Sequence, residues 1–404
     1  MTALGSFALH AALVVALYGI IAAAVALRRE DPALGEVARR AVLGWSAAVV
    51  LAAAALLYAL VTRDFSLRFV AETTSRDLSL GYTLTAFWGG HAGSLLLWTL
   101  ILGLYAVAAA SSLRWLPAAP AVTLTLLAVA AFFTAALLAG SPFESLPIPP
   151  PDGRGLNPLL RNPWMAFHPP ALYLGFVGTT VPFALTVAAL VGCDPTGTAR
   201  RAARSWMRVS WLLLTTGLLF GAKWSYVVLG WGGYWAWDPV ENAALMPWLT
   251  GAAYLHAAQV AERTGRLRDW SDALVLASFE LSILGTFLTR SGVLSSVHAF
   301  ADSGIGVYLL AFLAASTVLS LILLRRGRGA LGEMRSVPVD AVPGREAALL
   351  ASSVLLAVAA AAVLVGTVYP IVIEAATGDR INVGPPYFNQ ILIPLVVLLL
   401  PLMA

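Results

Sequence analysis

Residues 4–27 read LGSFALHAALVVALYGIIAAAVAL and contain no charged side chain. A helix that crosses the hydrocarbon core of a bilayer needs about 20 predominantly apolar residues, and this run is long enough. Backbone groups inside lipid find no water, so a spanning segment is either a helix or part of a closed barrel. Because the apolar residues are continuous and do not alternate with polar ones, the run predicts a transmembrane helix.

Runs of the same kind follow along most of the chain, which is 59% hydrophobic and only 11% charged. Soluble globular domains are about 25% charged, so this composition excludes that class. The further runs lie at 41–62, 94–111, 120–140, 170–192, 207–222, 242–261, 272–289, 305–324 and 347–369. An eleventh begins near Ile391 and continues to Ala404, so we expect the sequence to be part of a longer protein.

The fold prediction is an all-α polytopic membrane protein, a bundle of about 11 or more transmembrane helices with short loops. We expect residues 1–404 to form a single integral-membrane helical domain. Five alternate loops hold 17 of the 25 basic residues: 28–40, 112–119, 193–208, 262–271 and 325–346. Basic residues favour the cytoplasmic side, which predicts an outer N-terminus and puts these segments outside: 63–93, 141–169, 223–241, 290–304 and 370–390.

The outer-face segment 224–242 contains the stretch WGGYWAWDPVEN at Trp231–Asn242. One or two aromatic residues suffice to anchor a helix at a membrane interface, so this density predicts a flat apolar platform for a large planar ligand. The aromatic platform consists of Trp231, Gly232, Gly233, Tyr234, Trp235, Trp237 and Asp238. Asp238 and Glu241 have the spacing of a capping box around a helix start at Pro239. We therefore favour a structural role for both carboxylates over acid–base chemistry.

Two outer-face histidines lie on either side of the platform in the sequence. His168 precedes Pro169 and Pro170, which predicts a position at or beside a helix cap, and His298 lies in the 290–304 segment. Neutral imidazoles are suitable axial ligands for haem iron. The alternatives are a capping role for His168 and an ordinary loop position for His298, while His91 is expected to have a structural role.

Two ionisable residues lie inside predicted helices. His256 is surrounded in sequence by small residues such as Ala253 and Ala257, which would let another helix or a flat macrocycle approach. It is therefore a functional candidate, with a hydrogen-bonded packing histidine as the alternative. Glu280 should face the bundle interior and be protonated or paired. Lys223 and Arg290 flank the outer-face site, where they either pair with the propionates of a haem or mark helix ends.

Several motifs, in order along the chain, resemble CcmF, the large subunit of the bacterial cytochrome c haem lyase. WGGYWAWDPVEN is similar to the WWD signature of haem-handling membrane proteins. The other motifs are WGGHAGSLLLW at 88–98, NPLLRNPWMAFHPPALYLG at 157–175, LGTFLTRSGVLSSVHAFA at 284–301 and GPPYFNQ at 384–390.

The resemblance implies a multi-pass protein of the bacterial cytoplasmic (inner) membrane, with the N-terminus and the WWD segment on the periplasmic face. It implies that haem arrives from a CcmE-like chaperone. The protein would then attach that haem through thioether bonds to the CxxCH motif of an apocytochrome c, alongside CcmH-like and CcmI-like subunits.

The resemblance also assigns the ligands. His168 and His298 correspond to the outer-face axial pair, and His256 to the first iron ligand of an intramembrane haem b. A second intramembrane ligand is expected beyond Ala404. That haem suggests a quinol:haem oxidoreductase activity that keeps the incoming iron reduced.

Two other function classes remain at this point. The first is a haem transporter or exporter, because related WWD proteins handle haem without attaching it. The second is a membrane scaffold or an ion-translocating subunit. That class is disfavoured because His256 and Glu280 are too few for a long proton path.

Overall fold

The computed structural model describes residues 1–229, 232–265, 267–292, 304–330 and 344–403. Within these ranges the regular secondary structure is helical, which confirms the predicted all-α class. The helices are α1 (Thr2–Arg29), α2 (Pro32–Val61), α3 (Arg68–Thr73), α4 (Leu80–Thr85), η1 (Ala86–Trp88), α5 (His91–Ser112), α6 (Ala119–Ala139), η2 (Pro158–Leu160), α7 (Pro163–Gly178), α8 (Thr180–Leu190), α9 (Thr198–Val228), α10 (Pro239–Thr264), α11 (Arg268–Arg290), α12 (Gly306–Ala330), α13 (Gly344–Thr377) and α14 (Pro385–Met403).

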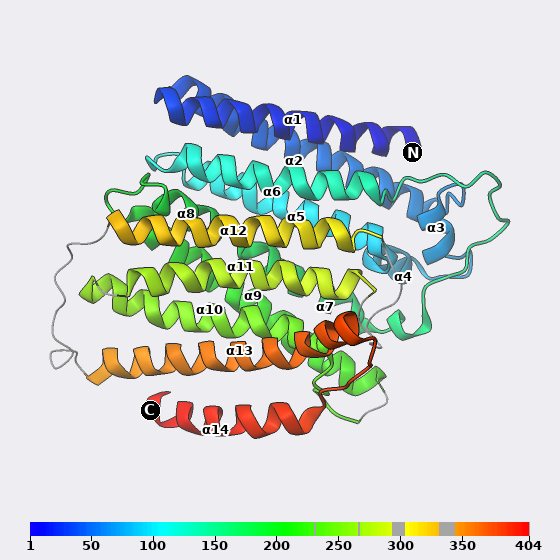
Figure 1. Ribbon diagram of the computed structural model, residues 1–404. Helices are drawn as coiled ribbons and strands as arrows, with labels where there is room; N and C mark the ends of the chain where they lie inside the picture. Colours follow the sequence, from blue (N-terminus) through cyan, green and yellow to red (C-terminus); the bar gives the residue numbers. More distant parts are fainter. Residues whose placement is uncertain (230–231, 266, 293–303, 331–343, 404) are drawn as a thin grey trace.

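The long helices lie side by side as a bundle (Figure 1). Ten segments of the described chain are long and apolar enough to cross a membrane, and α7 and α8 together form one of them. Ten of the eleven predicted runs each coincide with one long helix, whereas the run at 170–192 spans the end of α7 and all of α8. The helix α10 is not among the ten candidate spans. The chain is therefore a polytopic membrane protein. The helix α10, which carries His256, lies between α11 and α13 (Figure 1).

Interhelical hydrogen bonds fix α10 in place. Ser278 of α11 donates to Thr250 over 2.9 Å, and Asn242 donates to Thr367 of α13 over 3.1 Å. Further along the same pair of helices, Ser353 of α13 donates to the carbonyl of Ala253 over 2.9 Å. Such bonds stabilise helix packing inside lipid, where apolar burial between helices adds little.

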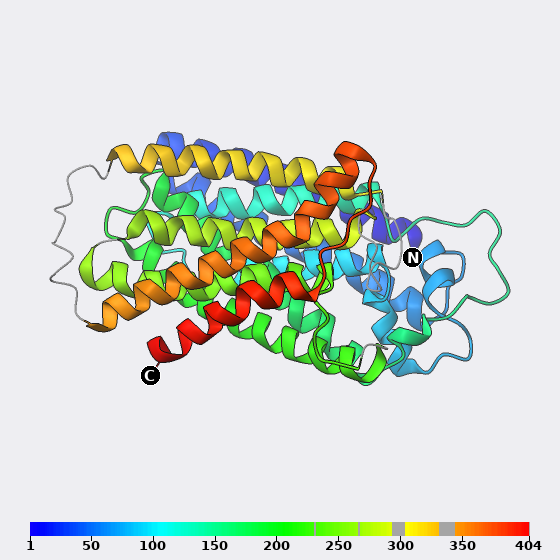
Figure 2. The same cartoon turned by 60° about the horizontal axis from the view of Figure 1, so that its bottom comes forward.

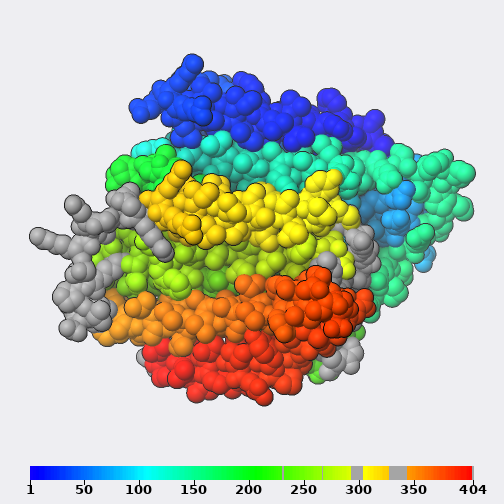
Figure 3. All heavy atoms as spheres, in the orientation of Figure 1, coloured from blue at the N-terminus to red at the C-terminus, as the bar shows by residue number. Residues whose placement is uncertain are grey.

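The segments predicted to be extracytoplasmic gather at one end of the bundle, on the right in Figures 1 and 2. We call this the outer end. It holds the N-terminus, α3, α4, the connection between α6 and α7, and the start of α14. The α6–α7 connection projects beyond the bundle (Figure 3). Two hydrogen bonds join it to the loop between α3 and α4. The guanidinium of Arg76 donates to the carbonyl of Pro151, and the backbone N–H of Arg76 donates to the carboxylate of Asp152.

Helices α7 and α9 approach each other very closely. A Cβ atom on Gly175 would lie 2.4 Å from Cα of Leu214, and one on Gly217 would lie 2.6 Å from Cα of Leu172. Gly217 and Gly221 have the GxxxG spacing that allows such close helix crossings. This seam carries His168 at its outer end.

Candidate functional site

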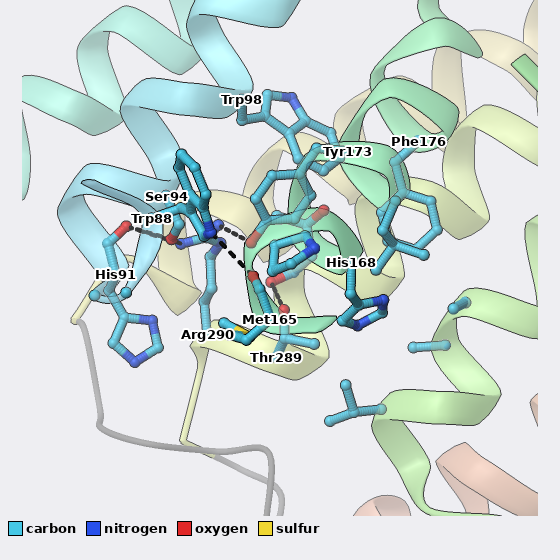
Figure 4. A pocket seen from close by; sticks show the side chains of 18 of the residues that line it. Trp88, His91, Ser94, Trp98, Met165, His168, Tyr173, Phe176, Thr289 and Arg290 are labelled. Atoms are coloured by element: carbon cyan, nitrogen blue, oxygen red, sulfur yellow. Dashed lines mark hydrogen bonds between the residues drawn. The ribbon is translucent and has the colours of Figure 1, made fainter. Parts of the chain in front are cut away.

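A cavity of about 160 Å³ opens at the outer end between α5, α7, α10 and α11. Its wall is mostly apolar, with a few polar groups that come from different helices (Figure 4). The aromatic, histidine and arginine side chains in the wall include Trp88, His91, His168, Tyr173, Trp224 and Arg290. An apolar cavity with a few convergent polar groups is the usual form of a small-molecule site.

His168 lines this cavity, but it does not lie at a helix cap as predicted. The cap is Asn162, whose side chain accepts from the backbone of Trp164, and Pro163 takes the first helical position. His168 therefore lies in the second turn of α7. Pro169 lacks an N–H and leaves the carbonyl of Met165 without a helical donor, and the indole of Trp88 donates to that carbonyl over 3.3 Å.

The seam between α7 and α9 orients the His168 imidazole. Its Nδ1 lies 2.9 Å from the carbonyl oxygen of Gly217. A carbonyl only accepts, so Nδ1 carries the hydrogen and the ring's lone pair lies on Nε2, which suits iron coordination. The ring also stacks on Trp224, with centroids 6.2 Å apart and planes 12° apart. Gly221 admits the ring, because a Cβ there would lie 2.6 Å from Cε1 of His168.

The aromatic platform lies beside His168. A second cavity, of about 50 Å³, is lined by Tyr234, Trp235 and Glu241 and shares His168 and Trp224 with the first. Trp231 and His298, which the sequence assigns to the same site, lie outside the described residues. A porphyrin is larger than either cavity, so the described walls would contact only part of one.

The two tryptophans of the platform that the structure describes have different surroundings. Trp237 stacks on the buried ring of Phe388, with centroids 4.9 Å and planes 10° apart, and its Nε1 donates to Asn389 over 2.9 Å. Its φ of 60° is in the left-handed region, which is unfavourable for a bulky residue and persists only when surrounding contacts hold it. Trp235 meets Trp237 edge to face at 5.8 Å.

The capping box at the start of α10 is confirmed. The carboxylate of Asp238 accepts from the backbone of Val240 over 2.8 Å. Glu241 accepts from the backbone of Ala236 over 2.8 Å and from that of Asp238 over 3.2 Å. Both carboxylates therefore hold the end of the platform against α10, as the structural interpretation predicted.

Arg290 is 3% exposed and forms part of the wall of the larger cavity. Its Nη1 donates to the carbonyl of His91 over 2.9 Å and to Ser94 over 3.0 Å, and its Nη2 donates to the hydroxyl of Tyr173 over 3.3 Å (Figure 4). The guanidinium thus ties α11 to α5 and α7. The other propionate candidate, Lys223, has its ammonium 5.5 Å from the ring centroid of Tyr226.

Sequence reasoning missed the contribution of α5 to this site. His91 of α5 lines the cavity although it was not a candidate ligand-binding residue, and the same holds for Tyr173 of α7. The signal available was the glycine-rich start of α5. A Cβ on Gly93 would lie 2.0 Å from the carbonyl oxygen of Phe87, so the turn that brings His91 to the cavity requires glycine there.

His256 lies 17 residues after the start of α10 at Pro239, or about 25 Å along the helix at 1.5 Å per residue. Its Nδ1 is buried and has no hydrogen-bond partner in the described part of the chain. Neighbouring Ala253 and Ala257 are buried and small. An orphaned imidazole nitrogen beside small residues fits an iron ligand, because coordination would satisfy it.

Glu280 faces α12, in line with the prediction of a group turned into the bundle. Its carboxyl oxygens accept from Ser316 over 2.7 Å, from Thr317 over 3.3 Å and from Ser320 over 3.0 Å. This carboxyl therefore links α11 to α12. It lies on a different side of α11 from Ser278, which bonds to α10. It does not line the outer-end cavities.

The segment that forms this site matches a known protein family. The model of the family described as "Cytochrome C assembly protein" matches residues 88–294, half of the chain. The chain belongs to the cytochrome c assembly protein family. The matched segment runs from Trp88 past Arg290, so it includes the whole wall of the larger cavity.

Members of this family resemble the chain over nearly its full length. It is 42% identical to the cytochrome c-type biogenesis protein ccl1 of Rhodobacter capsulatus, over 98% of this chain and 62% of that protein. It is 41% identical to the cytochrome c-type biogenesis protein CcmF of Pseudomonas aeruginosa, over 99% of this chain and 61% of that one. The chain thus spans about three-fifths of the length of these curated relatives.

A solved structure, the cytochrome c haem lyase CcmF, superposes with a TM-score of 0.81 at 36% identity. The match covers all of this chain and 60% of that one. The resemblance to CcmF that the sequence motifs indicated is therefore confirmed.

Proposed function

We propose that the protein acts as a haem lyase subunit in cytochrome c biogenesis, holding haem at the outer end while it is attached to an apocytochrome c. The observation that carries this proposal is the geometry of His168. It stands at the boundary of two cavities, beside the aromatic platform, and its Nδ1–H bond to Gly217 puts the lone pair of the imidazole on Nε2, the nitrogen that would bind iron. His298 is proposed as the second axial ligand from the sequence motif that carries it.

The size of the cavities suggests how attachment proceeds. A porphyrin held edge-on against the platform leaves its opposite edge outside the protein. Each thiol of a CxxCH motif adds across a vinyl group: a carbon–sulfur bond forms, and the thiol hydrogen passes to the other vinyl carbon, so no net electron is transferred. Fixing the macrocycle and thiols in register lowers the barrier by up to about 7–11 kcal/mol. The protein's part is therefore orientation.

His256 is proposed as one ligand of an intramembrane haem b, on the strength of its unpartnered Nδ1. Such a haem, when bound, supplies electrons that keep the incoming iron reduced, with quinol as the proposed donor. In this proposal the chain contributes the imidazole and the small residues of α10 that leave space beside it. A second ligand is not assigned to a described residue.

The same proposal includes the protein's setting. The chain forms a single helical domain in the bacterial cytoplasmic membrane, with the outer end on the periplasmic side, as the distribution of basic residues predicts. Its partners are a CcmE-like haem chaperone, CcmH-like and CcmI-like subunits, and apocytochrome c. In this proposal the haem at the outer end, with its iron, is the substrate that is attached to the apocytochrome. The haem b at His256 is a resident cofactor.

The function is tested by cytochrome c maturation in cells that carry single variants. His168→Ala and His298→Ala should abolish holocytochrome formation while the protein remains in the membrane. His10→Ala is the matched control, because that ring is exposed on α1 and bonds within its own helix to the carbonyl of Ser6. Full maturation in the His168 variant would contradict the proposal. A haem transporter would instead leave haem trapped inside when the protein is absent.

A further inference from the structure

The two described tryptophans of the platform differ in the hydrogen bonding of their indole N–H groups. The indole Nε1 of Trp237 is occupied, because it donates to Asn389. The indole Nε1 of Trp235 is buried and has no hydrogen-bond partner among the residues that the structure describes. A buried N–H without an acceptor is costly and rare in native proteins, so it needs an explanation.

The position of Trp235 indicates where the missing acceptor comes from. Its side chain lines the smaller cavity, which it shares with His168 and Trp224. Trp237 holds Trp235 from the side, edge to face. Trp237 is itself fixed by Phe388, by Asn389, and by Asn242, whose side chain donates to its carbonyl over 3.3 Å. Trp235 therefore lines the cavity beside a tryptophan that is held by three side chains, and its indole N–H has no acceptor among the described residues.

We propose that Trp235 is the residue that recognises a propionate of the bound haem, through a hydrogen bond from its indole Nε1 to the carboxylate. This assignment rests on the proposed function. The edge of protohaem carries methyl, vinyl and propionate groups, and only the propionates accept hydrogen bonds strongly. A donor in an apolar cavity therefore selects the propionate edge and turns the vinyl edge outward, toward the incoming thiols.

The charges around the cavity are compatible with an anion there. Glu241 also lines the smaller cavity, but its carboxylate is bonded to two backbone N–H groups at the N-terminus of α10, where the helix dipole offsets negative charge. Lys223 is not among the residues that line this cavity, and its ammonium lies 5.5 Å from the ring centroid of Tyr226. Arg290 contributes to the other cavity, where its guanidinium is engaged by α5 and α7. Trp235 is thus the donor that the described lining of the smaller cavity offers to a carboxylate.

The test compares two ligands and two variants. Protohaem carries two propionates, whereas octaethylhaem has ethyl groups at all eight outer positions and therefore lacks them. The change that a variant makes in the ratio of the two dissociation constants measures propionate recognition. Both constants are measured by absorption titration of the purified protein in detergent. The measurements use a His256→Ala background, so that the intramembrane site does not contribute.

Trp235→Phe keeps an aromatic ring and removes the N–H. We expect it to weaken protohaem binding roughly 10- to 100-fold, the value of one hydrogen bond to a charged group, and to leave octaethylhaem binding unchanged. Trp237→Phe is the matched control. Its N–H already has an acceptor in the protein, so both affinities should change by the same factor and the ratio should stay at the wild-type value.

Other results overturn the inference. Equal weakening of both ligands by Trp235→Phe would mean that Trp235 contributes only packing. An unchanged ratio together with unchanged affinities would mean that it does not touch the ligand. If the protein without these substitutions binds neither haem, the proposed function fails first, which distinguishes the two cases.

Discussion

Replacing Gly221 by alanine should displace the His168 ring and spare the rest of the fold. A Cβ on Gly221 would lie 2.6 Å from Cε1 and 2.8 Å from Nδ1 of His168, and the nearest atoms around it all belong to this ring. The conflict therefore ends if the imidazole rotates away. That movement breaks the hydrogen bond to Gly217, which costs about 0.5–1.5 kcal/mol.

The neighbouring Gly217 supplies the comparison. A Cβ there would lie 2.6 Å from both Cα and the backbone nitrogen of Leu172. Backbone of a packed helix cannot rotate away, so Gly217→Ala has to separate α7 from α9, and overpacking of this kind costs about 1–3 kcal/mol or more. Gly221→Ala should thus lose ligand binding with little loss of stability, whereas Gly217→Ala should lose both.

The assay is haem titration and thermal unfolding of the purified protein in detergent. Gly221→Ala should weaken haem binding at the outer end by at least about tenfold, the equivalent of 1.4 kcal/mol, and lower the unfolding temperature only slightly. Gly81→Ala is the control, because a Cβ at Gly81 has no neighbour within 4 Å. A haem affinity equal to that of the wild type in Gly221→Ala would show that the position of the His168 ring does not depend on a glycine at 221.

Three further outcomes follow from the described contacts. His256→Ala should remove the low-spin absorption of an intramembrane haem from the purified protein, and retention of the full spectrum would exclude this residue as a ligand. Arg290→Met should destabilise the fold by roughly 2–4 kcal/mol, because it leaves buried acceptors on α5 and α7 without their donor. Thermal unfolding measures the effect against Arg380→Met, whose ion pair is exposed. Asn389→Leu should weaken haem binding by up to about tenfold through the loss of the Trp237 bond; an equal effect of Gln390→Leu, an exposed neighbour, would contradict this.

Local patterns in the sequence predicted local structure well. Continuous apolar runs predicted the long helices because the bilayer requires each run to satisfy its own backbone. The capping box at Asp238 and Glu241 was predictable because its hydrogen bonds join residues three apart. The same logic misplaced the start of α7, since two prolines after His168 suggested a first turn, whereas Asn162 and Pro163 form it.

Contacts between distant segments could not be predicted in this way. Trp237 and Asn389 are 152 residues apart, and Arg290 and His91 are 199 residues apart. Neither spacing carries a signal, because helix order in the bundle decides which side chains meet. Four of the five sequence motifs contribute residues to the walls of the two outer-end cavities. Trp237 bonds to α14, whereas Trp235 lines the smaller cavity. This difference depends on how the helices pack, so the sequence could not show it.

The most direct test of the central claim is the electron paramagnetic resonance spectrum of ferric haem at the outer end, recorded in the His256→Ala background. We expect a low-spin signal of bis-imidazole type that is lost in His168→Ala and restored when free imidazole is added. A signal that is identical with and without the His168 side chain would show that this residue does not bind the iron.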